Sequence, residues 1–335
     1  MSRCLRMLAI LFLTVFASNA FAYDSLHVFG DSFSDTGNVP PLQPGYYNNR
    51  HSNGPLWTEY LSTNLGFSFA HANNHAEARS LSRDALVQAK GLSAISGSAL
   101  TVVWTGNNDL LSGLGRLSTN ESKVALINIS NIVETLVEKG ARTVVIANLM
   151  DFTQTPVYST NTPLYLLTFV QKGVNSFNAD LFKLREQLSI KLPQARIEYF
   201  DLAAAFGILR ASAQSIGFAR VDLGALRDTT LQDKSFEGPG ANYLFWDHVH
   251  PTTKAHRVIA NWFEAAAGPR ILTSFKTLEI DFLEVGKTYS IETSPNLAAW
   301  ANESTFQASS NRISFALQET LPTRFFRLRW MPGGN

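Results

Sequence analysis

Short apolar runs alternate with longer amphipathic stretches along most of this sequence. Runs rich in β-branched and aromatic residues predict buried strands at residues 26–29, 100–104, 143–149 and 196–200. Apolar residues at helical spacing predict helices at residues 56–65, 80–94, 121–139, 169–192 and 251–266. Strands that alternate with helices indicate an α/β fold, with a mostly parallel sheet covered by helices on both faces.

Local signals add detail to this pattern. Gly66 follows the first predicted helix and is expected to end it. Ser82 is expected to cap the second helix. Pro251 is expected to open the last helix. A proline is favourable at the first helical position because the N–H that it lacks would be unpaired there in any case. A weaker strand is expected at residues 67–70.

The pattern changes around Gly268 and Pro269. Strand-like runs separated by turns follow at residues 278–282, 288–293, 312–317 and 325–330. We therefore expect an α/β domain over residues 23–268 and a small all-β domain over residues 271–335.

The last of these runs alternates apolar with basic side chains. Its apolar face carries Phe326, Leu328 and Trp330, and its basic face carries Arg327 and Arg329. The simplest interpretation of the basic face is a solvated sheet surface, and the alternative is a ligand-binding surface.

The first 22 residues have the parts of a secretory signal. Arg3 and Arg6 precede an apolar core from Met7 to Phe16, and Ala20-Phe21-Ala22 matches a cleavage site. That core is shorter than the roughly 20 apolar residues that cross a bilayer. We therefore expect a cleaved signal at residues 1–22 rather than a retained anchor, no integral membrane segment, and a secreted or periplasmic protein.

Composition excludes several kinds of chemistry for the mature chain. The only cysteine, Cys4, lies inside the predicted signal, which leaves no thiol for catalysis, disulfides or a zinc site. The formal net charge of +1 becomes −1 when Arg3 and Arg6 are removed, and no basic run remains. Nucleic acid is therefore not an expected partner.

Polar residues follow two of the predicted strands at their carboxyl ends. Ser32 lies in Gly30-Asp31-Ser32 after the first strand, and Asn108 follows the second. Each is typical of an ordinary turn when taken alone. In a parallel sheet both reach the same edge, which is where ligands of open α/β sheets bind.

Asp247 and His250 are three residues apart, just before the last helix. A loop returning to that sheet edge can bring both to Ser32. A serine hydroxyl needs a base to become nucleophilic, a histidine suits that role, and a carboxylate fixes the histidine tautomer. The Ser32 N–H and the Asn108 amide are candidate donors to an oxyanion. His248 is an alternative base.

Three stretches in this order resemble the SGNH, or GDSL-type, serine esterase and lipase family. They are Phe29-Gly30-Asp31-Ser32, Trp104-x-Gly106-x-Asn108-Asp109 and Asp247-x-x-His250-Pro251, with lesser matches at residues 52–57 and 148–151. The form of residues 29–38 is most similar to the secreted lipase, haemolysin and cholinesterase branch.

This resemblance implies a fold and a set of roles. The fold is a three-layer α/β/α sandwich with a mostly parallel, flavodoxin-like sheet. The implied roles are Ser32 as nucleophile, His250 as base, Asp247 as its orienting carboxylate, and Asn108 as an oxyanion donor.

One block departs from the family pattern, which places glycines in Asn-Tyr-Ala-x-Gly-Gly-Ala as a further oxyanion donor. The nearest stretch is residues 70–76, where Asn74 and His75 stand in place of glycines. A backbone N–H needs no particular side chain, and asparagine tolerates left-handed conformations. Asn74 is therefore expected to contribute to the oxyanion hole.

We expect a secreted serine hydrolase of carboxylic esters, either phospholipid or short-chain acyl esters, that needs no metal or cofactor. One alternative is an inactive hydrolase-like binding protein, with the β domain contacting a glycan or cell surface. Others are a polysaccharide O-deacetylase or an acyltransferase. A metal site would draw on His71, His75, Asp247, His248 and His250. Tyr46 and Tyr47 either line an acyl pocket or pack their loop.

Overall fold

The structure is a computed structural model. It describes residues 23–158, 162–268, 271–273, 277–281, 283–294, 299–316 and 325–331. The predicted signal at residues 1–22 and the predicted boundary at residues 269–270 lie outside the described residues. Both stay predictions.

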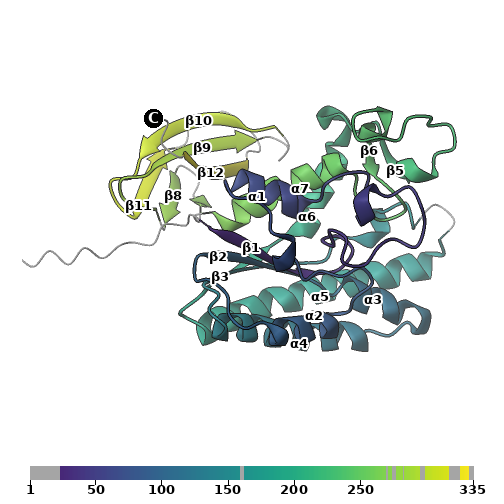
Figure 1. Ribbon diagram of the computed structural model, residues 1–335, viewed down its shortest axis with the longest axis horizontal. Coiled ribbons are helices and arrows are strands. Elements are labelled where there is room, and N and C mark those ends of the chain that lie inside the picture. Colours follow the sequence, from purple (N-terminus) through teal and green to yellow (C-terminus); the bar gives the residue numbers. More distant parts are fainter. Residues whose placement is uncertain are drawn as a thin grey trace, which may run out of the picture.

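A parallel sheet forms the centre of the molecule (Figure 1). Its order is β1 (Ser25–Gly30), β2 (Ala99–Trp104), β3 (Thr143–Ala147) and β4 (Arg196–Phe200). Every residue of β2 and β3 is buried, as expected of parallel strands with helices on both faces. The four predicted strands are confirmed, although β3 ends at Ala147 rather than at residue 149.

Helices cover this sheet from both sides and make the three layers that were predicted. In Figure 1, α1 and α7 lie together on one side, and α2, α4 and α5 lie on the other. The α-helices are α1 (Trp57–Asn64), α2 (Ser82–Gly91), α3 (Asn107–Gly113), α4 (Asn120–Glu138), α5 (Leu164–Lys191), α6 (Leu202–Ala211) and α7 (Thr253–Ala267). Short 3₁₀ helices lie at Tyr47–Asn49, His71–Asn73, Leu114–Arg116, Phe152–Gln154, Ala213–Ile216, Ala225–Arg227 and Pro239–Asn242.

Two of the predicted helix starts are wrong. Ser82 is the first helical residue of α2, and its hydroxyl donates to Asp109 instead of capping the helix, while Leu81 takes the cap position. Pro251 precedes α7 and forms an isolated bridge with Phe245. The prediction for Gly66 holds, because it follows α1 in a left-handed conformation with φ of 85°.

The weak strand predicted at residues 67–70 is also wrong. The chain pairs with β1 further along, through a bridge between Val28 and Asn74. His75 N–H then donates to Val28 O at 2.8 Å, and Glu77 N–H donates to Gly30 O at 3.2 Å. This segment extends the sheet outside β1, so the strand order becomes flavodoxin-like.

A second, small sheet was not predicted. It pairs β5 (Arg220–Gly224) with β6 (Tyr243–Phe245) in parallel. Immediately after β6 the chain folds back on itself, with Trp246 N–H donating to His250 O at 2.7 Å. This tight return determines where residues 247–250 lie.

Two antiparallel sheets make up the C-terminal β module, with orders β10-β9-β12 and β11-β8-β7. Their strands are β7 (Ile271–Thr273), β8 (Thr277–Asp281), β9 (Thr288–Ser294), β10 (Ala301–Gln307), β11 (Arg312–Ala316) and β12 (Phe325–Met331). The module has its own core, formed by Leu278, Ile280, Leu283, Tyr289, Ile291, Ala308 and Leu328. Strands β7 and β10 were not predicted.

The basic face of β12 is not uniformly solvated, which corrects the simplest interpretation of its sequence. Arg327 is buried, lies 3.7 Å from Glu264 of α7 and 2.5 Å from Glu292 of β9, and stacks over Trp300 at 4.5 Å. Arg329 remains half exposed. Arg327 therefore links the β module to the last helix of the α/β region.

In the part of the chain that the structure describes, we find no helix that combines the length and the apolarity needed to traverse a bilayer.

Candidate active site

Ser32 lies on a tight turn at the carboxyl end of β1. The carbonyl of Asp31 accepts bonds from Ser34 N–H at 2.9 Å and Asp35 N–H at 3.0 Å, and this closes the turn. Gly30 is required before the turn, because a Cβ there would come within 2.8 Å of Trp104 O on β2. The serine side chain is left partly exposed at the sheet edge.

A buried carboxyl group supports the turn from below. Asp31 is 1 % exposed, and its Oδ1 accepts from Phe33 N–H while its Oδ2 accepts from Asn107 Nδ2 at 2.9 Å. Burial raises the pKa of Asp31 to about 6 against the opposing effect of these bonds. Asp31 thus has a structural place in the turn, whereas Ser32 is partly exposed.

The structure brings Ser32, His250 and Asp247 together from opposite ends of the α/β region. Ser32 Oγ lies 2.8 Å from His250 Nε2, and His250 Nδ1 lies 2.7 Å from Asp247 Oδ2. The loop after β6 delivers the last two residues. Val249 N–H and His250 N–H both donate to Asp247 Oδ1 at 2.8 Å, which fixes the carboxylate against the loop.

This arrangement keeps the Asp247 carboxylate charged. Burial would raise the pKa of Asp247, but the charge of His250 and the hydrogen bonds from the loop outweigh it and hold that pKa below its usual range. A charged carboxylate on Nδ1 leaves Nε2 as the basic nitrogen that faces Ser32.

Asn108 reaches the same edge from the first turn of α3. Its Nδ2 donates to Ser80 O at 2.9 Å, which uses one of its two amide hydrogens and leaves the other for a ligand. The helix can start here because Gly106 takes a left-handed φ of 108°, where a Cβ would collide with Phe177 at 2.9 Å.

Asn74 does not fit the role of oxyanion donor that was expected of it. It adopts an extended conformation with φ of −94°, and its N–H donates to His71 O at 3.0 Å. Its amide hydrogens go to Ser34 O at 2.7 Å and Thr36 Oγ1 at 2.9 Å. All three donors of Asn74 are therefore bonded within the protein, and its side chain braces the Ser32 turn.

Arg79 is a residue that the sequence analysis missed. It has a left-handed φ of 70°, which is unusual for a side chain of its size. Its neighbours hold it beside the site: Glu77 N–H bonds to Gly30, and Ser80 O accepts from Asn108. Within the described residues neither Arg79 N–H nor Ser32 N–H has an acceptor. The sequence does carry a signal for this residue. If the family pattern Asn-Tyr-Ala-x-Gly-Gly-Ala is aligned with residues 74–80 instead of residues 70–76, its second glycine falls on Arg79.

Tyr46 and His51 were also missed as contacts of the loop after β6, residues 246–250, which is the candidate catalytic loop. Tyr46 O–H donates to Asp247 Oδ2 at 2.8 Å, and the His51 ring lies 4.9 Å from the His250 ring. Burial, and then the charge of His250, lower the pKa of His51 to about 4, so this ring is neutral near pH 7. Tyr47 points elsewhere and packs against Phe236.

The other candidate residues lie apart from Ser32. His248 is exposed on the loop after β6, and His250 rather than His248 contacts the serine. His71 Nδ1 bonds to Thr36, and His75 stacks on Phe29. Over the described ranges of the chain, no three histidine or acidic side chains are grouped closely enough to hold a metal ion.

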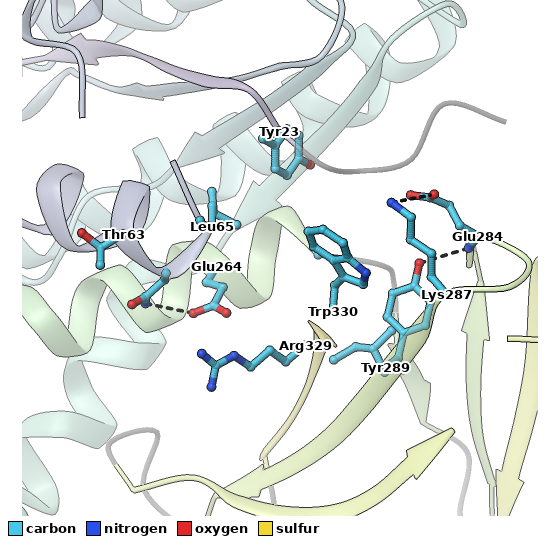
Figure 2. A pocket seen from close by; sticks show the side chains of 13 residues that line it. Tyr23, Thr63, Leu65, Glu264, Glu284, Lys287, Tyr289, Arg329 and Trp330 are labelled. Atoms are coloured by element: carbon cyan, nitrogen blue, oxygen red, sulfur yellow. Dashed lines mark hydrogen bonds and ion pairs between the residues drawn. The ribbon is translucent and has the colours of Figure 1, made fainter. Parts of the chain in front are cut away.

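A separate cavity of about 250 Å³ lies between the α/β region and the β module (Figure 2). Figure 2 shows Glu264 of α7 and Trp330 and Arg329 of β12 facing this space. Lys287 reaches the Trp330 ring at 4.5 Å and Glu284 at 3.2 Å. The lining includes none of the residues that contact Ser32, so this cavity is distinct from the candidate active site.

Comparison with known proteins places the chain among ester-acting enzymes. The model of the family described as "GDSL-like Lipase/Acylhydrolase" matches residues 26–263. The chain is 23% identical over 319 residues to a phosphatidylcholine-sterol acyltransferase of Aeromonas hydrophila, covering 76% of this chain and 93% of that protein. It is 23% identical over 264 residues to the thermolabile hemolysin of Vibrio parahaemolyticus, covering 69% of this chain and 60% of the hemolysin.

Among solved structures, the chain is also similar to an acetylxylan esterase from Geobacillus stearothermophilus. The two chains share 15% sequence identity with a TM-score of 0.44, over 74% of this chain and 95% of the esterase.

Proposed function

The chain belongs to the GDSL-like lipase/acylhydrolase family, a family of carboxylic ester hydrolases, and on that basis we propose that it cleaves its ester through an acyl-enzyme on Ser32. The observation that carries this proposal is the continuous chain of contacts from Ser32 Oγ through His250 to Asp247, at 2.8 and 2.7 Å. Such a chain is what makes a serine hydroxyl nucleophilic at neutral pH.

Each residue has a defined task in the first half of the reaction. His250 Nε2 takes the hydroxyl proton while Ser32 Oγ bonds to the ester carbonyl carbon. The carbonyl oxygen becomes an oxyanion, and His250 then gives its proton to the leaving alcohol. Asp247 holds the ring in the required tautomer and stabilises the imidazolium that forms in between.

Water repeats the same steps in the second half. His250 takes a proton from water as the water oxygen attacks the acyl carbon. The second tetrahedral intermediate collapses, the carboxylic acid leaves, and the proton returns to Ser32. This sequence requires no metal or cofactor.

We assign the oxyanion hole to three donors: the N–H of Ser32, the N–H of Arg79 and the remaining amide hydrogen of Asn108. The two backbone donors have no acceptor within the described part of the protein, and Asn108 has one spare hydrogen. Preorganised donors of this kind commonly supply the largest single stabilisation of the transition state.

The proposed substrate is a small-molecule or lipid ester, including phospholipid and short-chain acyl esters. Acyl transfer to an alcohol other than water is a second candidate, supported by the similarity to an acyltransferase that is covered over 93% of its length. Both reactions share the acyl-enzyme and differ only in what attacks it.

A fluorophosphonate probe tests the nucleophile. We expect the probe to label the full chain at Ser32, and Ser32→Ala to abolish both labelling and hydrolysis of p-nitrophenyl esters. Ser93→Ala, which changes an exposed serine, is the matched control and should label normally. Labelling that survives in Ser32→Ala would reject the proposal. Product analysis with an added alcohol then separates hydrolysis from transfer.

We also propose that the protein is exported, with the signal at residues 1–22 removed. Its sequence supports this through the basic start, apolar core and cleavage pattern. The amino terminus of the exported protein should be Tyr23, and recovery of a chain that begins at Met1 would contradict the proposal.

The β module is proposed to contact a surface or glycan, with the partly exposed Trp330 as its candidate contact. Loss of glycan binding in Trp330→Ala would test that role.

A further inference from the structure

We propose that Tyr46 is a positioning residue for the catalytic carboxylate: it supplies the fourth hydrogen bond to Asp247 and thereby holds Oδ2 in place against His250 Nδ1. The inference rests on the proposed function, because it assigns Tyr46 a role in the reaction of Ser32. Tyr46 itself does not contact Ser32 or the reacting ester.

The first support is the complete hydrogen bonding of Asp247. An ionised carboxylate has about four acceptor sites. Oδ1 accepts from Val249 N–H and His250 N–H at 2.8 Å, while Oδ2 accepts from His250 Nδ1 at 2.7 Å and Tyr46 O–H at 2.8 Å. Three of these donors come from the catalytic loop itself. Tyr46 is the remaining one, and it comes from a distant part of the chain.

The second support is the way in which Tyr46 is held. Its ring packs between the His51 ring at 5.6 Å and the Trp246 ring at 6.5 Å. Gly45, with φ of 98°, permits the turn that leads into it. Tyr46 is only half buried, yet its hydroxyl is aimed at a buried carboxylate rather than at water.

The third support is that the hydroxyl stays a donor throughout the working pH range. Burial, and then the negative charge of Asp247, raise the pKa of Tyr46 above its ordinary value. Ionisation of the phenol would place two negative charges 2.8 Å apart, so the phenol keeps its proton.

Tyr46 O–H and His250 Nδ1 both donate to Asp247 Oδ2, so each of them interacts with part of the negative charge on that oxygen. Removing the phenolic O–H leaves His250 as the only donor to that oxygen, so the carboxylate attracts the imidazolium more strongly. A stronger attraction between the carboxylate and the charged ring is a change that the pH dependence of the reaction reports. Other groups that face His250 are Asp31 below it, His51 beside it and the buried His256 of α7. These remain unchanged in a Tyr46→Phe variant.

Tyr46→Phe removes only this hydroxyl and keeps the packed ring. Tyr47→Phe is the matched control, because the neighbouring ring packs against Phe236 and does not touch the catalytic loop. We expect Tyr46→Phe to lower kcat about tenfold with little change in KM, since a hydrogen bond to a charged group is lost. The acid limb of kcat/KM should move to higher pH by about half a unit. Tyr47→Phe should match the wild type in both.

Two kinetic results would overturn the proposal. One is a Tyr46→Phe variant whose acid limb coincides with that of the wild type. The other is a loss that lies in KM alone. Either would mean that the tyrosine merely supports its loop or contacts the substrate.

A measurement on the unreacted protein separates this inference from the proposed function. The Nδ1–H resonance of His250, followed by NMR in the full chain, reports the hydrogen bond to Asp247 Oδ2 and should shift in Tyr46→Phe but not in Tyr47→Phe. This shift is expected even if no ester is turned over. Failure of the fluorophosphonate test would therefore reject the proposed reaction, whereas an unshifted His250 would reject the role of Tyr46.

Discussion

Arg79 has a backbone N–H at the candidate site and a left-handed conformation that is unfavourable for its side chain. A left-handed arginine is less stable than a glycine in the same position, and such strained residues are concentrated at functional sites. The flanking bonds of Glu77 and Ser80 hold it there. In the proposed oxyanion hole, Arg79 contributes its N–H and not its side chain.

This assignment gives a paired prediction. Asn108→Ala removes a side-chain donor and should lower kcat about a hundredfold, with KM little changed. Arg79→Gly keeps the N–H and relieves the left-handed strain, so kcat should stay within about twofold of the wild type. Steady-state kinetics with one p-nitrophenyl ester compares the two. An inactive Arg79→Gly variant would show that the guanidinium is needed.

The residues of the candidate site differ in how visible they are in the sequence. Ser32, Asp247 and His250 were named in advance because their spacing matches a family and their chemistry is complementary. Asn74 was misassigned and Arg79 was missed, because a hydrogen bond such as the one from Asn74 N–H to His71 O cannot be read from a sequence. Tyr46 lies about two hundred residues before its partner, and only the folded chain brings them together.

At the scale of elements, apolar runs identified β1 to β4, of which β2 and β3 are fully buried and β1 and β4 are partly buried. Strand β5 was missed because it is mostly only partly buried, and β6 was missed because it has three residues. The link between α7 and β12 was also missed. In the sequence Arg327 has the pattern of a surface residue, because its partners Glu264 and Glu292 come from other elements that only the folded chain brings beside it.

That link gives a prediction about stability. Arg327→Ala removes the cation that the buried Glu264 and the partly buried Glu292 share and should destabilise the protein by about 3–5 kcal/mol. Arg329→Ala, two positions along the same strand and half exposed, is the control and should change the stability by about 0.5 kcal/mol or less. Denaturant unfolding measures both. Equal effects of the two substitutions would contradict a special role for Arg327.

At the scale of the whole molecule, buried titratable groups predict how stability changes with pH. Burial lowers the pKa of His51 and His75 to about 4 and that of His256 to about 3. In the unfolded chain these rings titrate near pH 6.5. Between pH 6.5 and 4 the unfolded state therefore binds more protons, and stability falls as the pH is lowered.

Asp31 acts in the opposite direction, because its raised pKa of about 6 makes the folded state bind the extra proton below that pH. Burial also lowers the pKa of His27 and raises the pKa of Asp109 and Glu264, so four histidines oppose three carboxyl groups and a net loss of stability is still expected. We expect Tm to fall between pH 7.5 and 5, and to fall less steeply in His75→Phe, which removes one titrating ring from its stack on Phe29. A Tm that stays constant over this range would contradict the prediction.

The interdomain arginine has a further consequence for how this protein can be divided or recombined. The final helix of the α/β region carries a carboxylate whose cation comes from a strand some sixty residues later. Cutting the chain after α7 would leave Glu264 without its cation. Grafting the β module onto another enzyme would leave Arg327 without the carboxylate of Glu264. The two halves are thus complementary surfaces, and exchange of either one calls for a compensating change of charge in the other.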